Sequence, residues 1–340
     1  MGRYSFNKDE NSYKLVFLLF LILTFIPLFN GFVMLTREGG LHSSYYFVGY
    51  STGFGARKLL GTIFSFLLPD YATHRHLVPY IFGALLVFFL LFGIYMARTF
   101  KDVSVDTTPN ALPFLLLAVI YLASSYSLLF CYTLIWYVDI WLYLLTMIFI
   151  ILFARFRSKG AWPVVYGLIA LTACLVHHIF CCLFLPLFIA LFIYETFDGD
   201  KLSLRPALLY GATVLLVGAL CVCLWFFSSM NVSPEELSVE LGRRANDVCD
   251  NNPWMLNLLY GPSHANYRTM WDVGQFPIRY WQFPFLVLLL SPMIALYVSP
   301  WVISLRHCRN RIGKLKYALM LSASVLLFLP VFIVATDYGR

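Results

Sequence analysis

Several carboxylate and histidine side chains in this 340-residue sequence stand in or beside long apolar runs. An ionisable side chain within a lipid bilayer costs free energy, so it is by default a candidate for function. Carboxylates and imidazoles also act as general acids and bases in enzymes. We therefore predict that the candidate catalytic residues are Asp139, Glu38, His177, His178 and Asp337.

Basic residues that accompany these positions suit a second task, the binding of phosphate. Arginine binds phosphate oxygens through two parallel N–H groups, whereas lysine binds them as a point charge. Arg57 and Lys58 follow a segment with two glycines and precede an apolar run that starts at Leu59. We predict a phosphate-binding set of Arg57, Lys58, Arg75 and Arg340.

Each of these assignments has a purely structural alternative. Asp139 would then reach the membrane interface among aromatic residues, and the His177-His178 pair would be polar turn residues bonded to backbone carbonyls. Arg57 and Lys58 would contact only lipid headgroups. His74 and His76 lack a nearby Cys or Glu, so we predict no metal site and no cofactor.

The composition indicates which elements must position these residues. Hydrophobic residues make up 61% of the chain and charged residues only 12%, with a mean hydropathy of +0.77. Soluble domains carry about 25% charged residues, so the chain cannot cover a soluble surface of this size. The apolar runs are about 20 residues long, which spans a bilayer as a helix. We predict an all-α, polytopic transmembrane helix bundle.

The apolar runs predict a single integral membrane domain over residues 1–340 with about nine spans. We expect a tight turn at His177-His178, because the run that contains them is too long for one span. The first run is too long for a signal-peptide core and lacks a cleavage site, so we expect a retained span. The predicted spans are Leu15–Leu35, Leu77–Ala97, Ala111–Phe130, Val138–Phe153, Trp162–His178, Phe180–Tyr194, Ala207–Phe227, Phe283–Leu305 and Tyr317–Ala335.

The placement of basic residues predicts the orientation. The net charge is +7, and most Lys and Arg residues fall in short gaps between apolar runs rather than on a stripe suited to nucleic acid. Short basic loops stay in the cytoplasm, which favours an N-in, C-out chain in the plasma (inner) membrane. The two long segments 36–76 and 228–282 are then outer loops.

Both outer loops contain predicted helices. The run Leu59–Leu68 is apolar but too short to span, which indicates a re-entrant or interfacial helix. In the second loop Ser233, Pro234 and Glu236 form a helix start with a capping box, and Leu237 and Leu241 share a face. Asn252-Pro253 starts another short surface helix. The cysteines fall mainly within apolar runs, where they act as small hydrophobic residues rather than as a disulfide or zinc framework.

A family resemblance adds a functional expectation. It is carried by Gly53-Phe54, Arg57, Gly61, the His177-His178 pair before a Pro-containing span, and the terminal residues 337–340. With these motifs the chain resembles bacterial multi-pass envelope proteins. It is similar to exopolysaccharide polymerases and to multi-pass glycosyltransferases that use polyprenyl-linked sugars. The resemblance implies a glycosyl-transfer site on the outer face of the membrane.

The chain departs from these families at identifiable positions. Multi-pass glycosyltransferases usually carry an acidic pair or an acidic residue in the first outer loop, whereas this loop offers Glu38 and Asp70 and no adjacent pair. A His-Glu pair is expected where this chain has His177-His178. Such proteins usually continue beyond the last span, so the resemblance implies that this chain is a shortened form.

The functional prediction is therefore an enzyme that acts on lipid-linked sugars, by glycosyl transfer or polysaccharide polymerisation. Asp139 or Glu38 would be the base, Arg57 and Lys58 would bind phosphate, and the histidines would assist. We expect Asp139, the histidines and Asp337 to share one outer pocket. The partners are membrane lipids and a polyprenyl-linked sugar, with no nucleic acid. The alternatives are a transporter or flippase for a lipid-linked or amphipathic substrate, and a non-catalytic envelope assembly subunit.

Overall fold

The computed structural model describes five main stretches of the chain, residues 41–105, 138–157, 159–198, 201–244 and 310–326. It also describes single residues at 18, 22, 25, 29, 32, 33, 256, 260, 302, 305, 306 and 308. All structural statements below refer to these residues.

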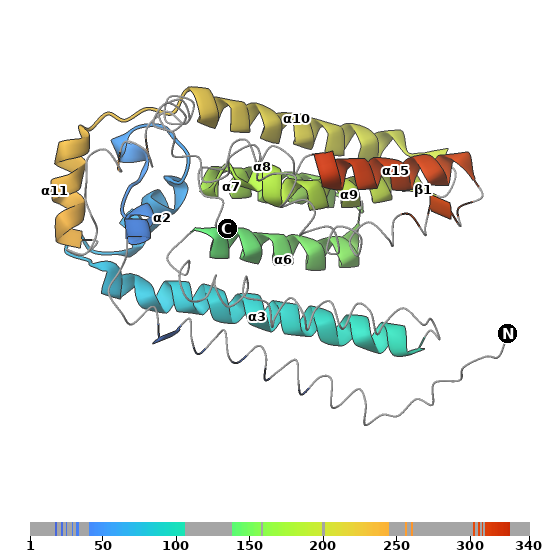
Figure 1. Cartoon of the computed structure of the whole chain (residues 1–340), viewed down its shortest axis with the longest axis horizontal. Helices are drawn as coiled ribbons and strands as arrows, with labels where there is room; N and C mark the ends of the chain where they lie inside the picture. The colour runs from blue at the N-terminus through green and yellow to red at the C-terminus, as the bar shows by residue number, and fades with distance from the viewer. Residues whose placement is uncertain are drawn as a thin grey trace, which may run out of the picture.

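The described chain is helical, apart from a hairpin of two very short strands (Figure 1). The helices α3, α6, α7, α9, α10 and α15 lie roughly along one axis and pack as the pairs α3–α6, α6–α7, α7–α10, α9–α10 and α9–α15. In chain order the elements are η1 (Leu41–Tyr46), η2 (Tyr50–Thr52), α2 (Leu59–Leu67), α3 (His74–Val105), α6 (Asp139–Phe156), α7 (Trp162–Val176), α8 (Phe180–Leu183), α9 (Leu185–Thr196), β1 (Phe197–Asp198), β2 (Lys201–Leu202), α10 (Leu204–Phe226), α11 (Pro234–Arg244) and α15 (Arg311–Leu326).

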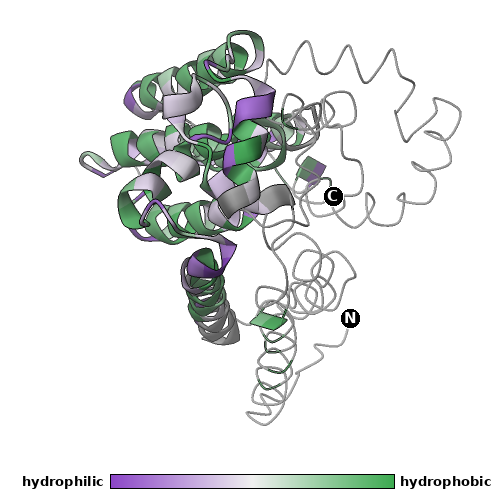
Figure 2. Ribbon diagram, turned by 90° about the vertical axis from the view of Figure 1, so that its left-hand side faces the viewer, coloured by the Kyte–Doolittle hydropathy of each residue, from purple (hydrophilic) through white to green (hydrophobic). Residues whose placement is uncertain are grey.

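Three described helices are long and apolar enough to cross a membrane: residues His74–Tyr95 of α3, all of α6 and all of α10. They coincide with the predicted spans that begin at Leu77, Val138 and Ala207. The shorter helices α7 and α9 are also apolar. Figure 2 shows the helices coloured mainly as hydrophobic, which agrees with the predicted all-α, membrane-type bundle.

The segment between Trp162 and Tyr194 confirms one prediction and corrects another. Directly after α7 the Phe180 N–H donates a hydrogen bond to the His177 carbonyl oxygen at 3.0 Å and closes a turn, so the predicted tight turn is confirmed. The predicted helix over 180–194 is wrong in one respect, because it breaks at Phe184 into α8 and α9. Pro186 explains the break, since proline has no N–H for an intrahelical bond and its ring clashes with the preceding turn.

The helices approach closely where their facing side chains are small. Gly167 of α7 lies against Thr213 of α10, and a Cβ added at Gly167 would come within 2.9 Å of the Thr213 hydroxyl oxygen. Small residues are typical of such contacts between membrane helices. Elsewhere the contacts are aromatic. The rings of Phe149 and Phe188 stack at 3.6 Å between centroids.

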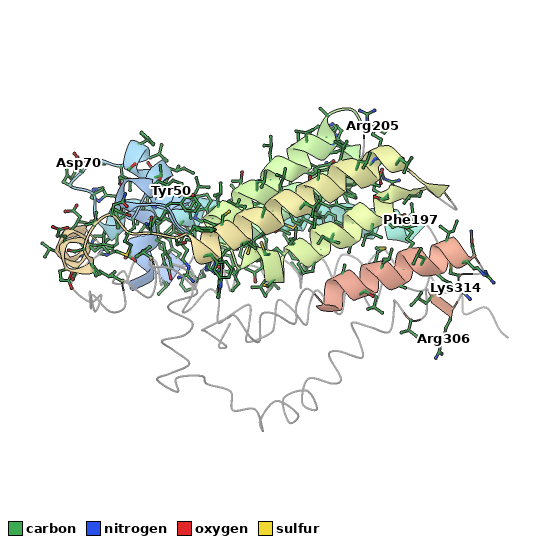
Figure 3. The ribbon with its side chains drawn as sticks, turned by 90° about the horizontal axis from the view of Figure 1, so that it is seen from above. Tyr50, Asp70, Phe197, Arg205, Arg306 and Lys314 are labelled. Atoms are coloured by element: carbon green, nitrogen blue, oxygen red, sulfur yellow. The ribbon has the colours of Figure 1, made fainter. Side chains whose placement is uncertain are left out.

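The bundle has two chemically different ends (Figure 3). The loop end, which we define by η1, η2, α2 and α11, carries Tyr50 and Asp70. The opposite end, which we call the basic end, carries the short hairpin and the labelled residues Arg205, Arg306 and Lys314. Lys316 of α15 joins elements there, because its Nζ atom donates a hydrogen bond to the Phe197 carbonyl oxygen at 3.1 Å.

The two predicted outer loops pack on each other at the loop end. Ser229 N donates a hydrogen bond to Phe54 O at 2.7 Å, and Asn231 N donates one to Thr52 O at 2.9 Å. The first loop is itself tightly folded, since Gly61 of α2 lies directly against the Val48 carbonyl group. These contacts make one compact substructure from segments far apart in sequence.

Helix α11 starts as predicted from its sequence. The Ser233 hydroxyl accepts a hydrogen bond from the Glu236 N–H at 3.1 Å, and the Glu236 carboxylate accepts one from the Ser233 N–H at 3.3 Å. This reciprocal pair is a capping box. Leu237 and Leu241 are buried, which confirms the predicted shared apolar face.

Several predictions lie outside the described residues. They comprise most of the first span, the spans at 111–130 and 283–305, the short helix after Asn252, and three predicted site residues: Glu38, Asp337 and Arg340.

Candidate functional site

A hydrogen bond between the first loop and the bundle forms the centre of the candidate site. The Nε atom of Arg57 donates to Nε2 of His177 at 2.9 Å. Arg57 lies just before α2, and His177 follows the last residue of α7. Two residues that the sequence assigns to different tasks, phosphate binding and acid–base chemistry, are therefore direct partners.

The loop holds Arg57 in a specific and costly conformation. Its φ angle is +67°, in the left-handed region that non-glycine residues rarely adopt. Its guanidinium carbon lies 5.3 Å from the centre of the Tyr45 ring, within cation–π distance. Backbone strain of this kind often occurs at functional sites, where surrounding contacts hold it in place.

His177 is held from both sides of its ring. The ring is buried, Nδ1 accepts a hydrogen bond from the Ile179 N–H at 3.0 Å, and Nε2 faces the Arg57 donor. An imidazolium has an N–H at both nitrogens and would oppose a donor at each, so this arrangement favours the uncharged ring. An uncharged ring has one accepting nitrogen, so in each tautomer it accepts from only one of the two donors. In the tautomer with the proton on Nδ1, His177 accepts from Arg57 and orients its guanidinium.

His178 lies close to α10. Its ring centre lies 5.0 Å from that of His177 and 5.9 Å from that of Trp225 in α10. The backbone carbonyl of His178 accepts a weak contact from the Cys221 thiol at 4.0 Å. His178 therefore links the turn to α10.

Asp139 is the first residue of α6 and is buried at 7% exposure. A helix N-terminus favours a negative charge, which suits a carboxylate at this position. Two residues along α6, Trp141 donates a hydrogen bond from Nε1 to the Tyr46 hydroxyl oxygen at 3.3 Å, and the charge of Asp139 is close enough to Tyr46 to act on it electrostatically. Burial raises the pKa of Tyr46, the bond from Trp141 opposes that rise, and the charge of Asp139 adds to it.

Two adjacent tyrosines connect Asp139 to Arg57. Tyr45 lies under the Arg57 guanidinium, and Tyr46 interacts with Asp139. Both tyrosines belong to η1, are almost fully buried and are neighbours in the chain. Neither tyrosine was among the predicted site residues, although a Tyr-Tyr pair in a polar loop is a signal in the sequence. They place the Arg57–His177 pair and Asp139 around the same short helix.

Lys58 makes contacts of another kind. Its side chain is fully buried, and Nζ donates to the backbone carbonyls of Ser229 at 2.9 Å, Gly53 at 3.1 Å and Thr52 at 3.4 Å. The ammonium group thus holds the two outer loops together. These contacts favour a structural role for Lys58 over the predicted phosphate-binding role.

Arg75 lies apart from these contacts. It is exposed in the first turn of α3, and no described contact joins it to Arg57 or His177. The predicted pocket shared by Asp139, the histidines and Asp337 is not tested, because Asp337 lies outside the described residues. Among the described residues, no group of three or more His, Cys, Asp or Glu side chains is arranged to hold a metal ion.

Comparisons with family models, with curated proteins and with solved structures find no match to this chain.

Proposed function

We propose that this protein is a multi-pass plasma-membrane enzyme that transfers or polymerises sugars from a lipid-linked phosphate donor at the outer membrane face. The Arg57–His177 hydrogen bond is the main support. It fixes a guanidinium next to a helix turn of the bundle, on a residue whose φ angle is in the strained left-handed region.

In this proposal Arg57 binds the phosphate of the donor. The Nε–H group of Arg57 donates to His177, which fixes the orientation of the guanidinium. A guanidinium binds phosphate oxygens through its planar set of N–H groups. When the bond between the sugar and the phosphate oxygen breaks, its electron pair stays on that oxygen. A fixed cation stabilises the developing charge without reorganising during the reaction.

Asp139 is the proposed base. It would take the proton of the acceptor hydroxyl while the hydroxyl oxygen attacks the sugar carbon that loses the phosphate. It is buried at the first position of α6, where the helix N-terminus favours the charged carboxylate. His177 positions Arg57 and takes no proton in this scheme.

The loop end also suits contact with lipid. Helix α2 buries Leu60 and Phe64 but exposes Ile63, Leu67 and Phe66, the last at 84%. An exposed apolar stripe on a short helix is expected where a helix lies in the membrane interface. A donor with a lipid tail would approach Arg57 along this surface.

The proposal requires the nine-span, N-in arrangement. A reporter fused after Arg157 should report the cytoplasm, and one inserted near Asn246 should report the outside. The reverse pattern would place the site on the wrong membrane face for this function.

The direct test is the analysis of lipid-linked sugars in a deletion strain. An enzyme of this type predicts that lipid-linked intermediates accumulate in the outer leaflet, where a glycosidase added to intact spheroplasts can digest them. Accumulation protected from the added enzyme would instead support a flippase. A strain with unchanged lipid-linked sugars would contradict both functions.

A further inference from the structure

Three cysteine thiols meet next to the histidine turn, and each comes from a different helix. The Sγ atoms of Cys174 in α7 and Cys181 in α8 are 3.7 Å apart. Cys221 of α10 lies close enough to both thiols to interact with them electrostatically. The spacing of these cysteines in the chain does not show that they meet, and their apolar surroundings predict only small hydrophobic residues.

We propose that Cys174 and Cys181 form a redox modification site, in which a disulfide closes the turn that carries His177. A disulfide has a sulfur–sulfur distance of about 2.05 Å, so the two sulfur atoms must approach by roughly 1.7 Å. Rotation of the two side chains can supply a movement of this size. The inference concerns the thiols alone and does not depend on the proposed function.

The chemistry is an exchange with an external disulfide. Cys181 is partly exposed and Cys174 is buried, so the Cys181 thiolate reacts first. It attacks the external disulfide, forms a mixed disulfide and releases one thiol. The Cys174 thiolate then attacks the Cys181 sulfur, the new internal disulfide forms, and the second external thiol leaves. Two protein thiols are oxidised and one external disulfide is reduced to two thiols.

The consequence for the fold is a covalent closure around the turn. Residues 174–181 contain His177, and the bond restricts the backbone that presents its ring to Arg57. Cys221 can reopen the loop, because a third thiol in contact with a disulfide can attack it. The three thiols thus form an exchange site beside the candidate functional site.

The test uses full-length protein in lipid nanodiscs with an apolar disulfide, dithiodipyridine, as the probe. One variant retains only Cys174 and Cys181, and a matched control retains only Cys174 and Cys182, with Ala at the other cysteines. We expect the first variant to lose two hydrogens by intact-mass measurement and to release two thiopyridone molecules per chain. The control should instead gain thiopyridyl groups.

Thiopyridyl groups on the Cys174/Cys181 variant, or no reaction there, would overturn the proposal. So would internal disulfide formation in the control. If either variant fails to elute as a single species, the wild-type background replaces it. There peptide mapping should find the Cys174–Cys181 cross-link in wild type and also in Cys223→Ser, because Cys223 is exposed and outside the cluster. Absence of this cross-link from both proteins would overturn the proposal.

Discussion

Arg57 donates a hydrogen bond to His177 across 120 residues of sequence. The bond joins a loop that follows two glycines to the turn between α7 and α8. Because Tyr45 lies on the other side of the guanidinium, Arg57 is held by an aromatic ring and an imidazole together. This arrangement has testable effects on the free energy of unfolding and on activity.

The strain at Arg57 predicts an unusual order of stabilities. Replacing Arg57 with Gly removes the penalty of a positive φ angle, whereas replacing it with Ala keeps that penalty. Both variants lose the bond to His177 equally. We therefore expect Arg57→Gly to be more stable than Arg57→Ala by about 1 kcal/mol in unfolding experiments in detergent. Equal stabilities would show that the loop relaxes when the arginine is removed.

The packing of α2 predicts a large difference between two glycine substitutions. A Cβ at Gly61 would overlap the Val48 carbonyl group, whereas a Cβ at Gly83 of α3 would meet nothing within 4 Å. Gly61→Ala should lower the free energy of unfolding by about 1–3 kcal/mol. Gly83→Ala should leave it unchanged or raise it by up to about 1 kcal/mol, through higher helix propensity. Similar losses in both variants would argue against the close approach of α2 to the loop.

The buried ammonium of Lys58 predicts a dependence of stability on pH. Burial lowers the pKa of Lys58 to about 8, from an ordinary value of 10.5. Between these values the unfolded chain binds more protons at this side chain than the folded chain does. The free energy of unfolding should therefore rise with pH through this window. In Lys58→Met the contribution of this side chain to the rise disappears.

Denaturant titrations at pH 7.5 and pH 10.5 measure this effect. The stability difference between wild type and Lys58→Met should grow in favour of wild type at the higher pH. Lys159→Met is the matched control, because Lys159 is exposed and follows the C-terminal end of α6. It should keep the wild-type pH dependence. A Lys58→Met variant with the wild-type slope would assign the rise to other groups.

Asp139 tests the proposed base. Asp139→Asn keeps the shape of the side chain and removes its ability to accept a proton. We expect the variant to reach the membrane at normal levels and to lose activity by about 100-fold or more, the usual contribution of a general base. Asp70→Asn, an exposed position at the same end, is the control and should be active. Activity of Asp139→Asn within a few-fold of wild type would exclude this role.

The sequence predicts the local features of this fold better than its long-range contacts. The capping box at Ser233 and the turn at His177 follow from residues within a few positions of each other. The break before Leu185 was also predictable, because Pro186 alone causes it. Such features depend on propensity and backbone bonding, which short segments encode.

The candidate site contains long-range contacts that the sequence does not predict. Arg57 and Lys58 are adjacent cations with similar patterns, yet one faces a histidine and the other is buried against carbonyls. Their difference depends on the backbone of Gly53 and on Ser229, which is 171 residues from Lys58. No periodicity or motif records a contact of that kind. The approach of Cys174 to Cys221 escaped prediction for the same reason.

The most direct test of the proposed site is complementation of the deletion strain by Arg57→Gln. The measured quantity is the amount of lipid-linked sugar in the outer leaflet, with the amount of protein in the membrane fraction checked in parallel. Arg205→Gln, at the basic end of the bundle, is the matched control (Figure 3). We predict that Arg57→Gln accumulates lipid-linked sugar as the deletion strain does, while Arg205→Gln restores the wild-type amount. Full restoration by Arg57→Gln at normal protein levels would contradict the proposal that Arg57 binds the phosphate of the donor.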